Sequence, residues 1–368
     1  MSSVDPLEAK LGKHARVLLP LMLLTFLAIS AWRMWPGLHV EPHRFSGATM
    51  GTTYNITVAA KGLSDEQRAA IEGAIARELS LVDRQMSNYR PDSELSRINT
   101  DGTGAVTVSA ELIEVLEIAR EVSEQSDGAF DVTVAPLIDA WGFGPGGEVE
   151  RSPDEASLAA LRAHTGYQKL TLDQRASTVQ KAHEQLSIDL SAIAPGYAAD
   201  RIALALEALE HDRYMVEVGG EVRAHGLNPD GDPWRLAIER PHVRDANTTP
   251  QKSAPRTIHT IVGLRDHGLA TSGDYRQFRA LDGTIVSHTI DPRSARPVAH
   301  ALASVTVVME DAARADAWAT ALTVLGPDEG MAVAERKDLA VLMLIRGEDD
   351  ALEERRSPAF DRLRNGDD

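Results

Sequence analysis

Asp316 and Thr320 are the residues of this sequence whose types and spacing most directly indicate chemistry. They lie four positions apart in an alanine-rich run, and in an α-helix residues at that spacing share one face. A carboxylate beside a hydroxyl offers hard oxygen ligands of the kind that Mg²⁺ takes, with its other positions left to water or phosphate oxygens. A solvated polar helix face would show the same pair, so spacing alone leaves both interpretations open.

The segment around this pair is predicted to be helical. Alanine and leucine favour helix, and Asp311 can cap the start of the segment. The dipeptide Gly326-Pro327 is expected to end it. We therefore expect a helix over residues 311–325, with Trp318 and Leu322 on the apolar face opposite the two oxygen ligands.

A second segment that could position a ligand is the turn at Pro195-Gly196. It follows a short strand candidate, residues 186–190, and opens a predicted helix. The free N–H groups at a helix start can hold an anion. An ordinary strand-to-helix connection is the alternative interpretation.

Strands and helices of both periods occur along the rest of the chain, which predicts an α/β (mixed α+β) fold. Further strands are expected at residues 52–58, 169–172, 214–218, 221–224, 234–239, 257–264, 305–308 and 339–345. Further helices are expected after the capping box formed by Ser64 and Gln67, after Ser109, and after the run from Ser152 to Glu155. The G-x-G-x-x-G match at residues 142–147 does not indicate a dinucleotide site, because Pro145 lies inside it and no helix start follows directly.

Composition narrows the class of protein. The 368 residues are 43% hydrophobic and 25% charged, as in a globular protein. With 38 basic and 55 acidic residues the formal net charge is −17, which argues against a nucleic-acid partner. The sequence has no cysteine, so disulfides, thiol nucleophiles and thiolate metal sites are excluded.

The N-terminal segment has the order of an exported protein's signal or anchor. Basic residues precede an apolar run over about residues 17–35. Ala28-Ile29-Ser30 also suits a signal peptidase, so cleavage and retention both remain open, and a buried core helix is the further alternative. We divide the chain into a basic start, anchor or signal segment and linker (1–40), a folded body (41–350) and a charged tail (351–368).

Short blocks spread through the body resemble the ApbE family, the FAD:protein FMN transferases. The blocks are Thr49-Met50-Gly51-Thr52, Met86-Ser87-Asn88-Tyr89, Asp92-Ser93-Glu94-Leu95-Ser96-Arg97, Gly128-Ala129-Phe130-Asp131, Asp189-Leu190-Ser191, Gly196-Tyr197-Ala198-Ala199-Asp200, Gly219-Gly220-Glu221, Thr271-Ser272-Gly273-Asp274-Tyr275, Ser287-His288, Ile290-Asp291-Pro292 and Ala315-Asp316-Ala317 through Thr320. Each block is short, but their order from about residue 45 to about residue 345 is specific to the family.

This resemblance implies a fold and an activity. The fold would be two-lobed, with a cleft between the lobes. The activity would be Mg²⁺-dependent cleavage of FAD, with FMN attached through a phosphoester to a threonine of an acceptor protein and AMP released. Acceptors in this family include exported redox-complex subunits, so the expected location is the periplasmic side of the cell inner membrane. Mg²⁺ suits the reaction because the charge of a pyrophosphate must be neutralised as its bond breaks.

The resemblance also assigns site residues. Asp316, Thr320 and the backbone carbonyl of Ala192 would hold the metal, and His288 would be the base that takes the proton of the acceptor hydroxyl. Flavin and phosphate contacts would fall at Met50, Ser87, Asn88, Tyr89, Asp131, Pro195 and Ile290. Pro195 stands where many relatives carry a charged residue, which argues against a side-chain phosphate contact there.

Two other functions fit the same residues. One is an Mg²⁺-dependent FAD pyrophosphatase, in which water replaces the threonine and the products are FMN and AMP. The other is a non-catalytic exported flavin-binding protein, which would need neither a metal nor a base.

Overall fold

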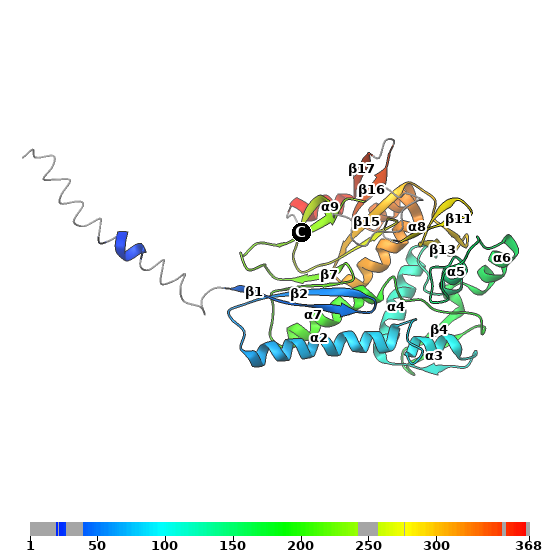
Figure 1. Ribbon diagram of the computed structural model, residues 1–368, viewed down its shortest axis with the longest axis horizontal. Helices are drawn as coiled ribbons and strands as arrows, with labels where there is room; N and C mark the ends of the chain where they lie inside the picture. The colour runs from blue at the N-terminus through cyan, green and yellow to red at the C-terminus, as the bar shows by residue number, and fades with distance from the viewer. Residues whose placement is uncertain are drawn as a thin grey trace, which may run out of the picture.

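The computed structural model describes residues 20, 22–26, 40–241, 257–275, 277–347 and 351–365 (Figure 1). Its centre is an antiparallel sheet of eight strands in the order β1-β2-β6-β7-β10-β15-β16-β17. These strands are β1 (Glu41–Thr49), β2 (Thr52–Ala60), β6 (Tyr214–Val218), β7 (Glu221–His225), β10 (Gly268–Gly273), β15 (Leu302–Met309), β16 (Ala340–Arg346) and β17 (Leu352–Arg356). The predicted mixed α/β class is confirmed.

Both faces of this sheet are buried, and the strand period of two divides the side chains between them. On β15, Val305 and Val307 join the core on one face, whereas Val308 joins the core on the other. Helices α2 (Asp65–Met86), α4 (Ala110–Gln125), α7 (Ala194–Ala208) and α8 (Ala312–Arg336) contribute to the first core. The hairpin of β8 (Trp234–Glu239) and β9 (Ile258–Leu264) and the helix α9 (Pro358–Asn365) contribute to the second.

A smaller group of elements has a core of its own. It comprises α5 (Ala135–Ala140), α6 (Glu155–His164), β11 (Phe278–Leu281), β12 (Thr284–Ser287), β13 (Ile290–Asp291) and β14 (Arg296–Pro297). Leu137, Trp141 and Ile290 are buried together there, and we call this group the satellite unit. Figure 1 shows its helices and strands gathered at one end of the molecule. The remaining elements are α3 (Glu94–Thr100), β3 (Val106–Thr107), η1 (Tyr167–Lys169), β4 (Leu170–Asp173) and β5 (Thr178–Lys181).

Capping residues begin the helices where the sequence predicts. The Ser64 hydroxyl accepts from the Gln67 N–H at 3.2 Å, and the Gln67 side chain accepts from the Ser64 N–H at 3.0 Å. Ser109 caps α4 through the N–H of Leu112 at 3.3 Å. In α6 the cap is Asp154, whose carboxylate accepts from the Ser157 N–H at 2.7 Å.

Helix α8 bends at the predicted stop and then continues to Arg336. Gly326 has φ 79° and ψ −177°, and Pro327 has no N–H to offer the Thr323 carbonyl. The Nε2 atom of His300 lies 2.8 Å from that carbonyl oxygen. Because a carbonyl only accepts, Nε2 carries the hydrogen and replaces the missing helix bond. The break is therefore stabilised by the side chain of His300, which lies just before β15, and a second helical segment follows the break.

Two further segments differ from the sequence prediction. Residues 186–190 do not form a strand: Ser187 makes one isolated bridge to Val134, and the Asp189 N–H donates to the Val132 carbonyl at 2.7 Å. Beyond residue 350, β17 pairs with β16 and α9 buries Phe360. The fold therefore extends past the boundary that charge patterning indicated, because the apolar side of α9 packs on the sheet.

The predicted anchor, residues 17–35, lies mostly outside the described residues. Pro20 and Met22–Phe26 are described, and they are helical and exposed. Among the described residues, no helix has both the length and the apolar character needed to cross a membrane.

Candidate functional site

Helix α8 places Asp316 and Thr320 on one face, as their spacing predicts. The Asp311 carboxylate caps this helix by accepting from the Arg314 N–H at 2.7 Å. Asp316 is buried, with 8% of its surface exposed, and Thr320 is half-buried. The hydroxyl and the carboxylate are therefore held by a rigid element with little access to bulk water.

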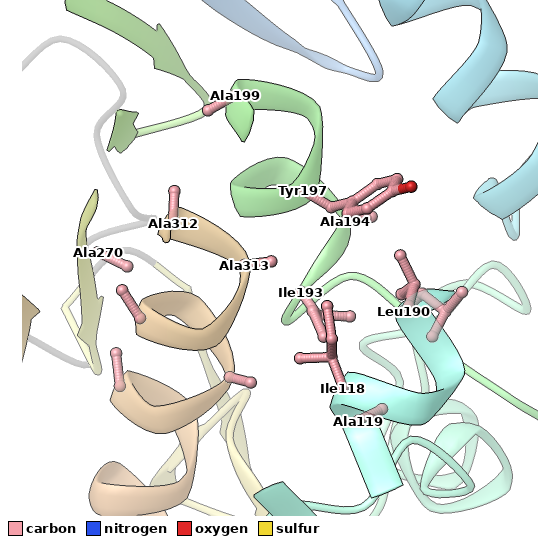
Figure 2. Packing of buried hydrophobic residues seen from close by; sticks show 14 of the residues in the cluster. Ile118, Ala119, Leu190, Ile193, Ala194, Tyr197, Ala199, Ala270, Ala312 and Ala313 are labelled. Carbon is pink, nitrogen blue, oxygen red and sulfur yellow. The ribbon is translucent and has the colours of Figure 1, made fainter. Parts of the chain in front are cut away.

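The start of α7 meets this face of α8. The N–H of Gly196 donates to Asp316 Oδ2 at 3.3 Å, although the two residues are 120 positions apart in the sequence. Ala192 lies in the turn just before α7, where the N–H groups of Ile193 and Ala194 donate to the Leu190 carbonyl. Figure 2 shows the first turns of the two helices side by side. The structure thus brings Asp316 and the turn that carries Ala192 together.

The electrostatics of Asp316 favour a bound cation. Burial raises the pKa of its carboxyl well above the ordinary value, and Glu221 and Asp200 raise it further, while the Gly196 N–H lowers it. A divalent cation would remove this penalty by pairing the charge. The described residues contain no group of three or more His, Asp or Glu side chains able to hold a metal. A cation here would therefore draw on hydroxyl, carbonyl, water or substrate oxygens, which suits Mg²⁺.

Met50 lies in the β1–β2 turn and Pro195 in the first turn of α7, and the segments that carry them both approach the β6–β7 turn. Met50 is at the tip of the β1–β2 hairpin with φ 43°. In the β6–β7 turn, a Cβ built on Gly219 would lie 3.4 Å from Thr52 Cγ2 and 3.5 Å from Pro195 Cβ. The predicted phosphate contact at Pro195 and the hairpin that carries Met50 are thus neighbours through Gly219.

Ser87, Asn88 and Tyr89 form the loop that ends α2. The Ser87 carbonyl accepts from the Ser93 hydroxyl at 2.6 Å, and the Ser87 hydroxyl accepts from the Tyr89 N–H at 3.2 Å. The Asn88 side-chain oxygen is buried and has no hydrogen-bond partner in the described part of the chain, and Tyr89 is 75% exposed. An unpaired buried acceptor beside an exposed ring leaves polar and aromatic groups available to a ligand.

A cavity of about 210 Å³ opens beside this loop. Asn88 lines it together with Asp139 and Asp189, which the site prediction did not include. Asp189 belongs to one of the resembling sequence blocks, but no pattern in the sequence indicates Asp139. A second hollow, of about 600 Å³, lies over α4 and contains none of the predicted site residues among those that line it.

The Asp131 carboxylate already accepts hydrogen bonds from neighbouring residues of the fold. Its carboxylate accepts from the Thr133 N–H at 2.8 Å, the Thr133 hydroxyl at 2.7 Å and the Tyr167 N–H at 2.8 Å. Burial raises the pKa of this carboxyl although these hydrogen bonds lower it. The side chain therefore holds residues 131–133 against η1, and its assignment to the flavin stays a prediction.

His288 and Ile290 belong to the satellite unit. His288 Nδ1 lies 2.9 Å from the Gln277 carbonyl oxygen, so Nδ1 carries the hydrogen and Nε2 is the basic nitrogen of the neutral ring. The Phe143 ring stands edge-on at 6.4 Å between centroids. Ile290 is buried, and its backbone pairs with Pro297. The structure thus fixes the tautomer that a general base requires, on a different element from the metal candidates.

Asp200 lies beside the metal candidates, although its sequence block indicated no role for it. Its carboxylate accepts from the N–H groups of Ala312 and Ala313, and burial raises its pKa from 3.8 to about 7. The folded protein therefore keeps this proton up to about pH 7, whereas the unfolded chain loses it above about pH 3.8. The free energy of unfolding should fall as pH rises through this window, by up to about 1.4 kcal/mol per pH unit.

Denaturant unfolding of metal-free protein between about pH 5 and pH 8 tests this expectation. Asp200→Asn has no carboxyl at this position, so its stability should decline less steeply with pH than that of the wild type. Equal slopes for the two proteins would contradict the raised pKa of Asp200.

Comparison with known proteins places the chain among its relatives. The model of the ApbE family matches residues 50–343. The FAD:protein FMN transferase of Vibrio cholerae is 41% identical over 322 residues, covering 87% of this chain and 92% of the relative. The enzyme of the same name from Escherichia coli is 37% identical over 317 residues, covering 85% and 87%. The solved apo form of flavinyl transferase ApbE from Pseudomonas stutzeri superposes with a TM-score of 0.78 at 38% identity, covering 89% and 98%.

Proposed function

The chain belongs to the ApbE family, and from this premise we propose that it is an FAD:protein FMN transferase that uses Mg²⁺ and modifies a threonine of an acceptor protein. The observation that carries the proposal is the contact between Gly196 and Asp316 at 3.3 Å. It joins two distant family blocks into one oxygen-rich site, where no cationic side chain among the described residues pairs with the buried carboxylate of Asp316.

The chain's own residues divide the work of the reaction. Asp316, Thr320 and the Ala192 carbonyl would hold Mg²⁺, which when bound neutralises pyrophosphate charge. The cavity beside Asn88 would receive part of the flavin nucleotide, and the exposed Tyr89 ring, next to Asn88 in the chain, would offer it an aromatic face. These groups orient the cofactor so that one phosphorus faces the acceptor.

The transfer step exchanges a phosphoanhydride bond of FAD for a phosphoester bond to threonine. The acceptor threonine oxygen forms a bond to the phosphorus of the FMN half of FAD. The bond from that phosphorus to the bridging oxygen breaks, and AMP leaves with the bridging oxygen. The threonine proton passes to Nε2 of His288, whose Nδ1–H is held by the Gln277 carbonyl.

We also propose that the body acts on the periplasmic side of the cell inner membrane. The support is the order of basic and apolar residues before position 36, which resembles a signal or anchor segment. Exported redox-complex subunits that carry an acceptor threonine are the corresponding partners. Fractionation of cells that express the full chain would test this location.

Incubation of the purified chain with FAD, Mg²⁺ and an acceptor domain tests the activity. Covalent flavin fluorescence on the acceptor after denaturing electrophoresis, with one AMP released per label, supports transfer. An acceptor with its threonine changed to valine should remain unlabelled. AMP without labelled acceptor would instead identify a pyrophosphatase, and FAD binding without either product would identify a flavin-binding protein.

A further inference from the structure

The first residue of α8 lies in direct backbone contact with two other elements. A Cβ at Gly196 of α7 would lie 2.3 Å from the Ala312 carbonyl oxygen, and a Cβ at Gly268 of β10 would lie 2.4 Å from the Ala312 nitrogen. Both distances are shorter than any side chain tolerates, so glycine is required at both positions. Because no side chain lies between the backbones, small movements of α8 at this point are resisted by hard contacts.

A carboxylate from α7 fixes this contact. Asp200 Oδ1 accepts from the Ala312 N–H at 3.0 Å, and Asp200 Oδ2 accepts from the Ala313 N–H at 2.9 Å. These N–H groups belong to the first turn of α8 and have no partner within that helix. Two oxygens bonded to two successive amides fix both the rotation and the axial position of the helix start.

The opposite contact runs from α8 to α7. Asp316 of α8 accepts from the Gly196 N–H in the first turn of α7. Each helix therefore supplies a carboxylate to free N–H groups at the start of the other. Figure 2 shows these two helix starts side by side, with Ala312 and Ala313 facing the first turns of α7.

We propose that Asp200 is a positioning residue for the metal site, which holds Asp316 and Thr320 of α8 at the correct distance from the Ala192 carbonyl before α7. The proposal rests on the proposed function, because the importance of this distance comes from a shared Mg²⁺. Mg²⁺ requires near-octahedral geometry with ligands at about 2.0–2.1 Å, so a small slip of one helix along the other removes a ligand.

Arg223 on β7 supports the same arrangement. Its Nε atom lies 3.9 Å from Asp200 Oδ1, and its side chain is only 18% exposed. The arginine balances part of the negative charge of Asp200 and holds the carboxylate from the sheet side. Asp200 therefore connects the sheet, α7 and α8 at one point.

A matched pair of variants separates positioning from general support of the helix. Asp200→Ala removes the cap that comes from α7, whereas Asp311→Ala removes the cap that α8 makes for itself at Arg314. Mn²⁺ serves as the probe, and its binding to each full-length protein is measured by calorimetry. We expect Asp200→Ala to bind Mn²⁺ about tenfold more weakly or worse, as for other residues that orient metal ligands. Asp311→Ala should bind within about twofold of the wild type, although both variants lower the melting temperature.

Asp200→Asn provides the conservative rescue. Its one acceptor oxygen can bond one of the two amides, so its Mn²⁺ affinity should lie between those of the wild type and Asp200→Ala. If circular dichroism shows that Asp200→Ala does not fold, this variant decides the question alone. Wild-type affinity in Asp200→Asn would then overturn the proposal, and weaker affinity would support it.

The outcomes distinguish this proposal from the proposed function. If the wild type binds Mn²⁺ and Asp200→Ala binds it equally well with a lower melting temperature, Asp200 only stabilises the fold and the proposal is overturned. If Asp311→Ala weakens Mn²⁺ binding as much as Asp200→Ala does, the hydrogen bonds from Asp200 on α7 have no special role in positioning the metal ligands, and the proposal is overturned. If the wild type binds no Mn²⁺, the metal site itself fails, and the positioning role fails with it.

Discussion

Replacing Asp316 with alanine is expected to abolish Mg²⁺-dependent FMN transfer. Asp316 supplies the one carboxylate among the three predicted metal ligands, and the other two are a neutral hydroxyl and a neutral carbonyl. Without that charge, the remaining ligands are too weak to hold Mg²⁺ against water. Transfer to an acceptor domain, followed by covalent flavin fluorescence at a series of Mg²⁺ concentrations, measures the loss.

Asp316→Asn separates this loss from a loss of folding. The carboxamide has almost the same shape, and its oxygen can still accept from the Gly196 N–H. Burial raises the pKa of the Asp316 carboxyl, so the charged form destabilises the metal-free protein, and a neutral side chain removes that cost. We expect the metal-free melting temperature of Asp316→Asn to equal or exceed that of the wild type while transfer is lost.

Mg²⁺ should stabilise the wild type but not this variant. A ligand at one hundred times its dissociation constant adds about 2.7 kcal/mol to the free energy of unfolding. The melting temperature of the wild type should therefore rise on addition of Mg²⁺, and that of Asp316→Asn should not. Normal transfer by the variant at limiting Mg²⁺, or an unchanged Mg²⁺-induced rise, would show that the metal is held elsewhere.

Thr320→Val is the matched test of the second ligand. Valine keeps the branched shape of threonine on α8 but removes the oxygen. Its expected effect is a higher Mg²⁺ requirement with transfer restored at saturating metal, since a neutral ligand contributes less than a carboxylate. A variant indistinguishable from the wild type would remove Thr320 from the metal shell.

Capping residues in the sequence predicted the starts of helices well. The Ser64 capping box and the Ser109 cap depend on residues within one turn of each other, so the sequence contains everything that they need. The same holds for Asp316 and Thr320, because helical spacing alone places them on one face. Features built within a few residues were therefore predictable.

Features built from distant residues were not. The bend at Gly326 continues as a helix because His300 replaces the bond that Pro327 removes. The cap that Asp200 places on α8 joins residues 112 positions apart, and no periodicity records such a contact. The segment 186–190 has apolar alternation but found only one bridge, at Ser187, since pairing partners decide whether an apolar run becomes a strand.

The same division applies to the candidate site. The resemblance predicts Ala192 and Asp316 as metal ligands, and the hydrogen bond from the Gly196 N–H to Asp316 brings their two segments together. Their role as ligands stays a prediction. By contrast, Asp139 reached the cavity beside Asn88 through the packing of α5, without any local signal. The chemistry of a site can thus follow from its residue types, while its complete lining requires the fold.

Replacing His288 with alanine is expected to slow FMN transfer by roughly 10²–10⁴-fold, the usual contribution of a general base. A threonine hydroxyl is a weak nucleophile near neutral pH, so the transition state needs a group that takes its proton. FAD binding should be largely retained, because the ring contacts the Gln277 carbonyl and the Phe143 edge. Single-turnover transfer at saturating FAD measures the chemical step apart from binding.

The pH profile and rescue by a small base separate this role from a structural one. In the wild type, the rate should rise with pH as the base loses its proton, and this limb should disappear in His288→Ala. Added imidazole should restore part of the variant's rate, since it can occupy the space that the ring leaves. His259→Ala is the control. His259 on β9 lies 2.6 Å from the Glu354 carboxylate on β17, so its replacement should leave transfer unchanged. Two outcomes would identify His288 as a structural residue of the satellite unit. In the first, His288→Ala keeps the pH profile of the wild type. In the second, imidazole fails to restore the rate of the variant and the melting temperature of the variant falls.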